Sequence, residues 1–339
     1  MTSVLTHQYI KRENEAIMDE RLFADKIINA IYSIQRECPS VLFNVLTSKR
    51  ASKVLAFFNY DLPMGDKLTG GRKLLLSLGV DMSECLDPPR KLNTVRNVFE
   101  RKIKYWDCRP MTQDDAVVVS PADAKMIVGS FASESLLFIK EKFFHFEELL
   151  GADKKNWISA FKGGDFSIFR LTPEKYHYNH TPVSGKVVDI YEIDGRYHSC
   201  NPGAVVSLIT PFSKNKRVVT IIDTDVSGGS HVGKVAMIEI TALMIGEIVQ
   251  CYSDIRYDLP IPVKEGMLLK KGQPKSLYRP GSSVDVVIFE KNKIRFSKDI
   301  LRNLNRTDVN SRFSRHFQKS LVETEVKVRS PIAERIDKK

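Results

Sequence analysis

The spacing of short β-branched runs constrains the fold of this chain more than any other feature. From about residue 114 onward, segments rich in Val, Ile and Thr recur between glycines, prolines and other turn residues. They cover residues 116–120, 166–171, 185–191, 217–222, 235–240 and 283–289. Such runs are typical of buried strands. The spacers between them are too short or too glycine-rich for regular βαβ crossovers, so the sequence favours an antiparallel β core.

The first hundred residues predict helices instead. Between residues 21 and 35, apolar side chains recur three and four positions apart, which indicates an amphipathic helix. A second apolar stretch covers residues 41–60, and a short helical pattern covers 92–103. We therefore expect an α+β fold with a mainly antiparallel β core and a helical N-terminal region. The expected parts are residues 1–110, contacting a membrane or a dimer partner, and a β-rich domain at 111–339. Helices that only pack on their own core would give the same stripes.

Composition excludes several classes of protein. The 339 residues are 42% hydrophobic and 27% charged, which is ordinary for a globular protein and unlike a disordered or collagen-like chain. No uncharged apolar run reaches about 18 residues, so we expect no transmembrane segment. The start of the chain also lacks the pattern of a secretory signal. The five cysteines are widely spaced without a CxxC pair, which indicates free thiols in a reducing compartment.

The charge balance indicates polyanionic partners. Lys and Arg number 52 against 41 Asp and Glu, so the formal net charge is +11. A basic surface attracts nucleic acid or an anionic bilayer. No RNP1-like, KH-like or zinc-finger pattern is present, so we expect no nucleic-acid partner.

The histidines at 177 and 180 form the one close pair in the sequence. On a helix, this spacing could place two imidazoles around a metal. Pro182 and the strand-like sequence on either side indicate a loop instead, and no Cys or carboxylate stands at ligand spacing, so we expect no metal. The open alternatives are two structural histidines, or a general acid/base and its neighbour.

Two further segments could contribute to chemistry. Asp123 follows the run at 116–120, where an aspartate is usually a turn former but could also orient an imidazole. Gly281, Ser282 and Ser283 stand at the start of the run at 283–289 and by themselves indicate a turn. A serine hydroxyl can, however, attack the carbonyl of the residue before it, and a glycine there lets the hydroxyl reach that carbon.

Taken together and in this order, these segments resemble the phosphatidylserine decarboxylase family of pyruvoyl-dependent enzymes. Residues 120–123 are similar to the family's SPADG, and residues 169–185 to its RLxPxDYHRxHxPxxG, the most specific match. Residues 271–273 with 281–283 resemble its KGxE and its cleavage motif GST or GSS. Weaker similarity covers residues 80–89, 97–110, 197–202, 233–246 and 323–327. The departures are Ala124, Glu247 and Pro280, and none removes a residue that does chemistry.

The resemblance implies a self-cleaving proenzyme. Asp123 would orient His180, and His180 would take the proton of Ser282 as Ser282 attacks the carbonyl of Gly281. Ser283 would assist by hydrogen bonding. The implied products are a chain ending at Gly281 and a chain of residues 282–339 that begins with a pyruvoyl group made from Ser282.

The same resemblance implies the reaction. The pyruvoyl group would form a Schiff base with the amine of phosphatidylserine and accept the electrons left by CO₂, giving phosphatidylethanolamine. His177 would protonate the resulting carbon, although the two histidines could exchange roles. The alternatives are a pyruvoyl-dependent decarboxylase of a free amino acid, for example an aromatic one, and a non-catalytic lipid-binding relative.

The expected partners follow from that substrate. We expect an anionic membrane containing phosphatidylserine, peripheral attachment on its cytoplasmic side, and a homodimer in which each half consists of the two cleaved chains.

Overall fold

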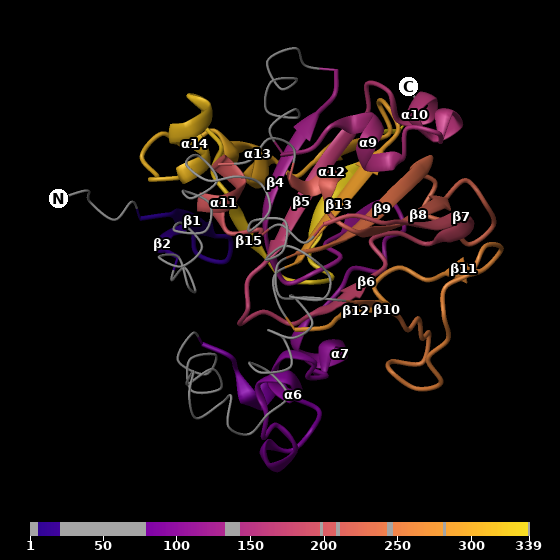
Figure 1. Cartoon of the computed structure of the whole chain (residues 1–339). Helices are drawn as coiled ribbons and strands as arrows, with labels where there is room; N and C mark the ends of the chain where they lie inside the picture. Colours follow the sequence, from indigo (N-terminus) through magenta and orange to yellow (C-terminus); the bar gives the residue numbers. More distant parts are fainter. Residues whose placement is uncertain are drawn as a thin grey trace.

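A ten-stranded sheet organises the chain (Figure 1). The computed structural model describes residues 6–20, 79–132, 143–196, 199–207, 211–242, 247–280 and 283–337. From edge to edge the strands are β11 (Leu268–Leu269), β7 (Gly185–Ile193), β8 (Arg217–Asp223), β9 (Lys234–Thr241), β13 (Ser283–Phe289), β5 (Asp165–Leu171), β4 (Ala124–Ser130), β15 (Thr324–Val326), β1 (Gln8–Lys11) and β2 (Ala16–Asp19). Neighbouring strands run antiparallel except β1 and β15, which are parallel.

Two small sheets accompany the large one. The first consists of β10 (Ile248–Gln250), β12 (Pro274–Tyr278) and β6 (Tyr178–His180), and the second of β14 (Ile294–Phe296), β16 (Pro331–Arg335) and β3 (Val117–Val119). The end of β12 leads directly into β13, so the chain crosses from a small sheet to the middle of the large one over four residues, 279–282. This crossover contains Gly281 and Ser282, which lie outside the described residues.

The described helices are short. They are η2 (Met82–Glu84), η3 (Pro89–Lys91), α6 (Val95–Phe99), α7 (Tyr105–Cys108), α9 (Phe146–Leu150), α10 (Lys155–Phe161), α11 (Pro202–Ser207), α12 (Pro211–Lys214), α13 (Lys298–Leu304) and α14 (Arg312–Phe317). Thr94 caps α6, the helix expected within 92–103, because its hydroxyl accepts a hydrogen bond from the Asn97 amide. Within the described ranges, no helix is both long and apolar enough to cross a bilayer.

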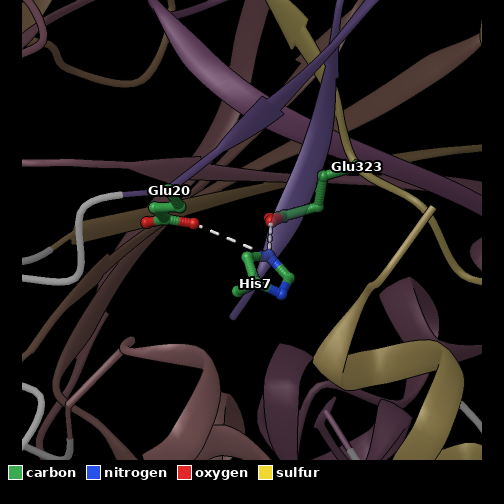
Figure 2. A group of neighbouring side chains, drawn as sticks. All are labelled: His7, Glu20 and Glu323. Atoms are coloured by element: carbon green, nitrogen blue, oxygen red, sulfur yellow. Dashed lines mark hydrogen bonds and ion pairs between the residues drawn. The ribbon is translucent and has the colours of Figure 1, made fainter. Parts of the chain in front are cut away.

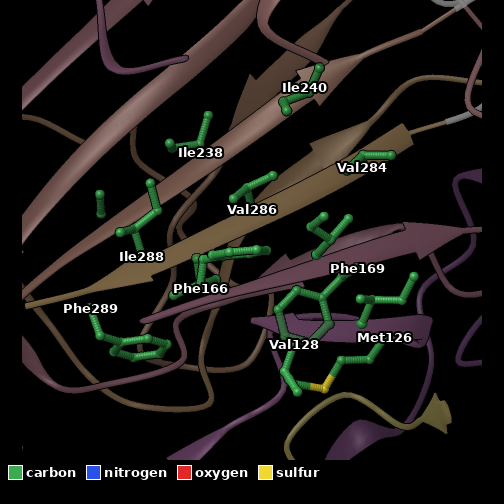
Figure 3. Packing of buried hydrophobic residues seen from close by; sticks show 14 of the residues in the cluster. Met126, Val128, Phe166, Phe169, Ile238, Ile240, Val284, Val286, Ile288 and Phe289 are labelled. Carbon is green, nitrogen blue, oxygen red and sulfur yellow. The ribbon is translucent and has the colours of Figure 1, made fainter. Parts of the chain in front are cut away.

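Strand β13 forms the centre of the core (Figure 3). All seven of its residues are buried. Val284 and Val286 lie directly opposite Ile240 and Ile238 of β9, and Ile288 lies opposite Phe166 of β5. Burying each such side chain stabilises the fold by about 1.5–3 kcal/mol. The residues that follow position 282 are therefore held firmly by packing on both sides.

The prediction of an α+β fold with a helical N-terminal region is wrong. The described chain is mostly β, and its N-terminal residues form the hairpin β1–β2, which extends the large sheet. Each strand of this hairpin has only four residues, and Ile10 alone is fully buried, so the sequence shows no alternation long enough to detect. The helix expected over 21–35 and the apolar stretch at 41–60 lie outside the described residues.

A buried ionic cluster ties the N-terminal hairpin to the C-terminal part of the chain (Figure 2). The Nε2 of His7 lies 2.7 Å from Glu323 and 3.6 Å from Glu20. Arg170 donates to both carboxylates, and the Nζ of Lys125 lies 3.2 Å from Glu20. Carboxylates and an imidazole this close could hold a cation, but two positive side chains already compensate them. The cluster therefore acts as an ionic tie between distant segments.

We predict that Glu323→Gln destabilises the fold by about 3 kcal/mol at neutral pH, because it weakens a buried pair with Arg170. Although burial opposes it, Arg170 and His7 lower the pKa of Glu323 from 4.5 to about 2. The carboxylate therefore stabilises the fold above pH 4.5 and loses this effect as the pH falls toward 2. Urea unfolding at several pH values measures both effects.

Glu13→Gln is the matched control for this measurement. Glu13 pairs with Lys327, and both side chains are half exposed, so its loss should cost less than about 1 kcal/mol. Equal effects of the two substitutions would contradict the assignment of the buried cluster as a tie.

Candidate active site

Antiparallel pairing places the two histidines beside the chain that leads to the crossover. His180 is the last residue of β6 and lies opposite Pro274 of β12. His177 directly precedes β6, and its carbonyl accepts a hydrogen bond from the Tyr278 amide at 3.0 Å. Of the pair predicted to lie in a loop, His177 lies outside any strand and His180 lies in the short strand β6. Its pairing brings His177 next to the last residue of β12.

His177 is a fully buried imidazole that packs against α6. Its ring stacks on Phe99 of α6, with 3.6 Å between the ring centroids. Neither ring nitrogen has a hydrogen-bond partner among the described residues. Burial lowers the pKa of His177 well below its usual range, so the ring is neutral and one nitrogen offers a lone pair. An orphaned buried imidazole indicates a group reserved for chemistry.

His180 ends a chain of hydrogen bonds. Its Nδ1 lies 2.8 Å from the carbonyl of Gly272 and therefore carries a proton, which leaves Nε2 to accept from the Tyr176 hydroxyl at 3.0 Å. The hydroxyls of Tyr176 and Tyr257 lie 2.6 Å apart. Gly272 has a φ of +73°, which a side chain would strain, so glycine suits the position that presents this carbonyl.

The tyrosine chain can serve His180 in two protonation states. Burial lowers the pKa of His180 to about 3, so the neutral ring is the resting form. In that form the Ile103 amide donates to Tyr257, which donates to Tyr176, which donates to Nε2. If Nε2 gains a proton, the hydroxyls can turn so that Tyr257 donates to the Ile103 carbonyl at 2.9 Å. A proton can therefore be stored at His180 by rotating two hydroxyl groups.

Asp123 pairs with Arg109 and makes no hydrogen bond to His180. Its two oxygens accept from the guanidinium at 3.0 and 2.7 Å, and a third bond comes from the Val328 amide. Although burial alone would raise it, Arg109 holds the pKa of Asp123 below its usual value. Asp123 lies near His180 through the backbone, because the His180 amide donates to the carbonyl of Pro121. The expected direct contact between the two side chains is absent from the described structure.

A second set of buried polar groups flanks the crossover. The Tyr278 hydroxyl oxygen lies 2.9 Å from the Val284 carbonyl and 2.7 Å from Asp285, and it accepts from the Ile240 amide. One hydroxyl proton cannot serve two acceptors, so a protonated Asp285 completes the set. Burial and the neighbouring Glu239 raise the pKa of Asp285 well above its usual range, which agrees with this arrangement. Tyr278 and Asp285 thus fasten the two ends of the crossover to each other.

Glu239 of β9 holds the negative charge of this region. It lies directly opposite Asp285 in the sheet, and its carboxylate accepts from Lys275 at 2.7 Å and Gln250 at 2.8 Å. Asn179 also donates to it. Two carboxylates side by side in a buried sheet cannot both ionise at low cost, and Asp285, whose pKa is raised, is the neutral one.

The crossover itself is fixed on its upstream side by Arg279. The guanidinium donates to both oxygens of Glu100 at 3.2 and 3.0 Å, and Glu100 caps the helix that carries Phe99. Downstream, Ser283 is buried at the start of β13, and its hydroxyl has no partner among the described residues. The segment that contains the predicted cleavage site therefore joins two anchored ends.

Sequence reasoning missed the tyrosines, Asp285 and Glu239. Tyr176 adjoins His177 in the motif, and Tyr257 lies 81 residues away, so only the fold could join them. The carboxylates did leave a signal: each interrupts a run that is apolar on both faces, in residues 235–240 and 283–289. A charged residue at such a position is costly unless it is paired or neutral.

Comparison with known proteins gives the family. The family model for phosphatidylserine decarboxylase matches residues 95–314. The phosphatidylserine decarboxylase proenzyme of Fusobacterium nucleatum is 29% identical over 308 residues, covering 87% of this chain and 91% of the relative. That of Clostridium tetani is 28% identical over 303 residues, covering 88% and 93%. Proenzyme 3 of Schizosaccharomyces pombe is 30% identical over 281 residues, covering 82% of this chain and 25% of the relative. The chain belongs to the phosphatidylserine decarboxylase family, and it is a decarboxylase.

We predict different effects on stability for substitutions at Tyr278 and Asp285, the residues that connect the two ends of the crossover. Tyr278→Phe should destabilise the fold by about 1–3 kcal/mol, because the Ile240 amide and Asp285 lose a buried partner. Asp285→Asn should be nearly neutral, because an amide donates to Tyr278 as a protonated acid does. Urea unfolding measures both. A large loss of stability in the asparagine variant alone would show that Asp285 is ionised.

Proposed function

We propose that the chain converts phosphatidylserine to phosphatidylethanolamine and CO₂ by means of a pyruvoyl group made from Ser282. The structural observation that supports this is a set of buried polar groups without partners on the segments that flank the crossover. His177, the Ser283 hydroxyl and one oxygen of Asp285 lack partners among the described residues. Buried polar atoms are rarely left unpaired unless they await a reacting group or a ligand. The surroundings of position 282 therefore fit a pyruvoyl group.

The proposed self-cleavage needs one base and a fixed turn. The Ser282 hydroxyl attacks the carbonyl carbon of Gly281, the peptide bond becomes an ester, and the proposed acceptor of the proton is His180, whose Nε2 is hydrogen-bonded to Tyr176. Elimination of the ester leaves a carboxylate on Gly281, and addition of one water with loss of ammonia leaves a pyruvoyl group at 282. Holding both ends of the crossover favours the reaction because the hydroxyl and the carbonyl stay close.

In the mature enzyme the pyruvoyl group supplies an electrophilic carbonyl that can accept the electron pair released with CO₂. The chain's own residues control protons and water there. The neutral ring of His177 has one N–H and one lone pair, so one nitrogen could give its proton to the carbon that loses its carboxylate while the other nitrogen takes a proton up. Phe99 covers one face of its ring and limits the access of water.

We propose that the two products of cleavage remain one folded unit. Residues 282–339 would contribute β13 to the centre of the large sheet, β15 to its other half and β14 and β16 to a small sheet. The buried ionic cluster also joins the two chains, because Glu323 of the C-terminal chain contacts His7 and Arg170 of the N-terminal chain. Separating the chains would expose most of the core. A dimer of such units is the proposed assembly.

The proposed partner is an anionic bilayer that contains phosphatidylserine. The net charge of +11 favours attraction to such a surface, and a lipid substrate requires contact with it. Peripheral attachment on the cytoplasmic side is the location that we propose, consistent with the free cysteines.

We predict that the two histidines separate into different steps. His180→Ala and Tyr176→Phe should slow the appearance of the 282–339 fragment at least about tenfold, because both interrupt the proton path. His177→Ala should mature and then lose most decarboxylation of phosphatidylserine. Gels and CO₂ release measure the two steps separately.

Tyr178→Phe is the matched control, since Tyr178 stacks beside Tyr176 but lies outside the proton path. Ser282→Ala should give one intact chain without activity. Normal cleavage in His180→Ala together with failed cleavage in His177→Ala would reverse the two roles. Activity of the intact Ser282→Ala chain would overturn the proposed function.

A further inference from the structure

Exposed apolar side chains gather on one segment of the molecule. Among the described residues, eight large hydrophobic side chains are exposed. Three of them lie between β10 and β11, at Ile255, Leu259 and Ile261, and a fourth, Leu268, begins β11. Leu259 is 80% exposed, the highest value of the eight. Figure 1 shows this segment standing away from the sheets at the lower right. Apolar groups concentrated in this way mark a contact surface.

Hydrogen bonds give the segment a defined shape. Tyr252 and Ile261 exchange two backbone bonds of 2.9 Å, which close the loop at its base. Inside it, the Ser253 hydroxyl donates to the Asp258 carbonyl, and the Asp258 amide donates to the Ile255 carbonyl. The leucine at the tip is therefore presented to solvent by an ordered loop.

The backbone at the tip is strained. Leu259 has a φ of +48° and Arg256 a φ of +59°, both in the left-handed region that costs a side-chain-bearing residue about 1–2 kcal/mol. A strained leucine that is mostly exposed gains nothing from the described fold. Strain of this kind persists where function requires it.

The same loop reaches the proton path of the active site. Tyr257 lies between Ile255 and Leu259 in the sequence, but its side chain is buried. Its hydroxyl is hydrogen-bonded to that of Tyr176, which is hydrogen-bonded to His180. Arg256 lies over the ring of Trp106 at 3.9 Å. Leu259 is thus only two positions along the chain from Tyr257, which belongs to the hydrogen-bond chain of His180.

The charge of the segment indicates what covers it. Over residues 254–270, three basic side chains and three acidic ones cancel, so electrostatic attraction is not the local driving force. A proline follows each of Leu259 and Ile261, which removes two backbone donors that would resist an apolar medium. An apolar tip without net charge suits the acyl region of a bilayer.

We infer that residues 255–261 form a docking loop that inserts Ile255, Leu259 and Ile261 into the lipid bilayer and delivers phosphatidylserine to the active site. This inference rests on the proposed function, because that function places the substrate in a membrane. The long-range attraction comes from the net charge of the whole chain, and the loop adds apolar contact close to the proton path.

The test uses the full, matured chain. Ile255→Ser, Leu259→Ser and Ile261→Ser are combined, and Leu301→Ser on α13, also exposed, is the control. Binding to vesicles of phosphatidylcholine with phosphatidylserine should weaken at least about tenfold in the triple variant and remain unchanged in the control. Decarboxylation of phosphatidylserine in vesicles should fall in parallel, while that of a short-chain, monomeric phosphatidylserine should persist.

A spectroscopic readout separates this inference from the proposed function. Leu259→Trp should show blue-shifted emission on vesicles, relative to the parent with Trp106 and Trp157, whether or not the enzyme is active. Vesicle binding of the triple variant equal to that of the parent would overturn the inference, as would a loss of dimer without a loss of vesicle binding. If the parent released no CO₂ from either form of the lipid, the proposed function would fail. The emission shift would still test whether the loop inserts into vesicles.

Discussion

The crossover between two sheets is the constraint on which the rest of the structure depends. β6 and β12 fix the chain up to Tyr278, and β9 and β5 fix it again from Ser283 onward. Four residues must join these anchored ends, and the hydroxyl of Tyr278 fastens them by its bonds to Val284 and Asp285. The self-cleavage that we propose falls within this short span.

Burial determines the protonation state of the groups around this span. His177 and His180 are neutral because charging them inside the fold is costly, and Asp285 is neutral for the same reason. Ion pairs stand beside these neutral groups, at Glu239 with Lys275 and at Asp123 with Arg109. The site thus combines neutral groups that can exchange a proton with fixed ion pairs that hold the surrounding strands.

The sequence predicted the strands better than their arrangement. The runs at 185–191, 217–222, 235–240 and 283–289 became long strands because β-branched residues were consecutive there. Strands of two to four residues, such as β1, β6 and β11, left no periodic signal, so the N-terminal hairpin was not expected. Asp123, His177 and His180 were predicted as site residues from their motifs. The tyrosine path and the partner of Asp123 depend on contacts between distant segments, which no local pattern contains.

The central claim is that the chain makes its own electrophile at position 282. The most direct measurement is the mass of the C-terminal fragment after incubation with phosphatidylserine and reduction by borohydride. The account predicts a fragment of residues 282–339 that is blocked at its N-terminus and carries the mass of the reduced lipid adduct. A fragment that begins with an unmodified serine, or an intact chain of 339 residues without label, would contradict it.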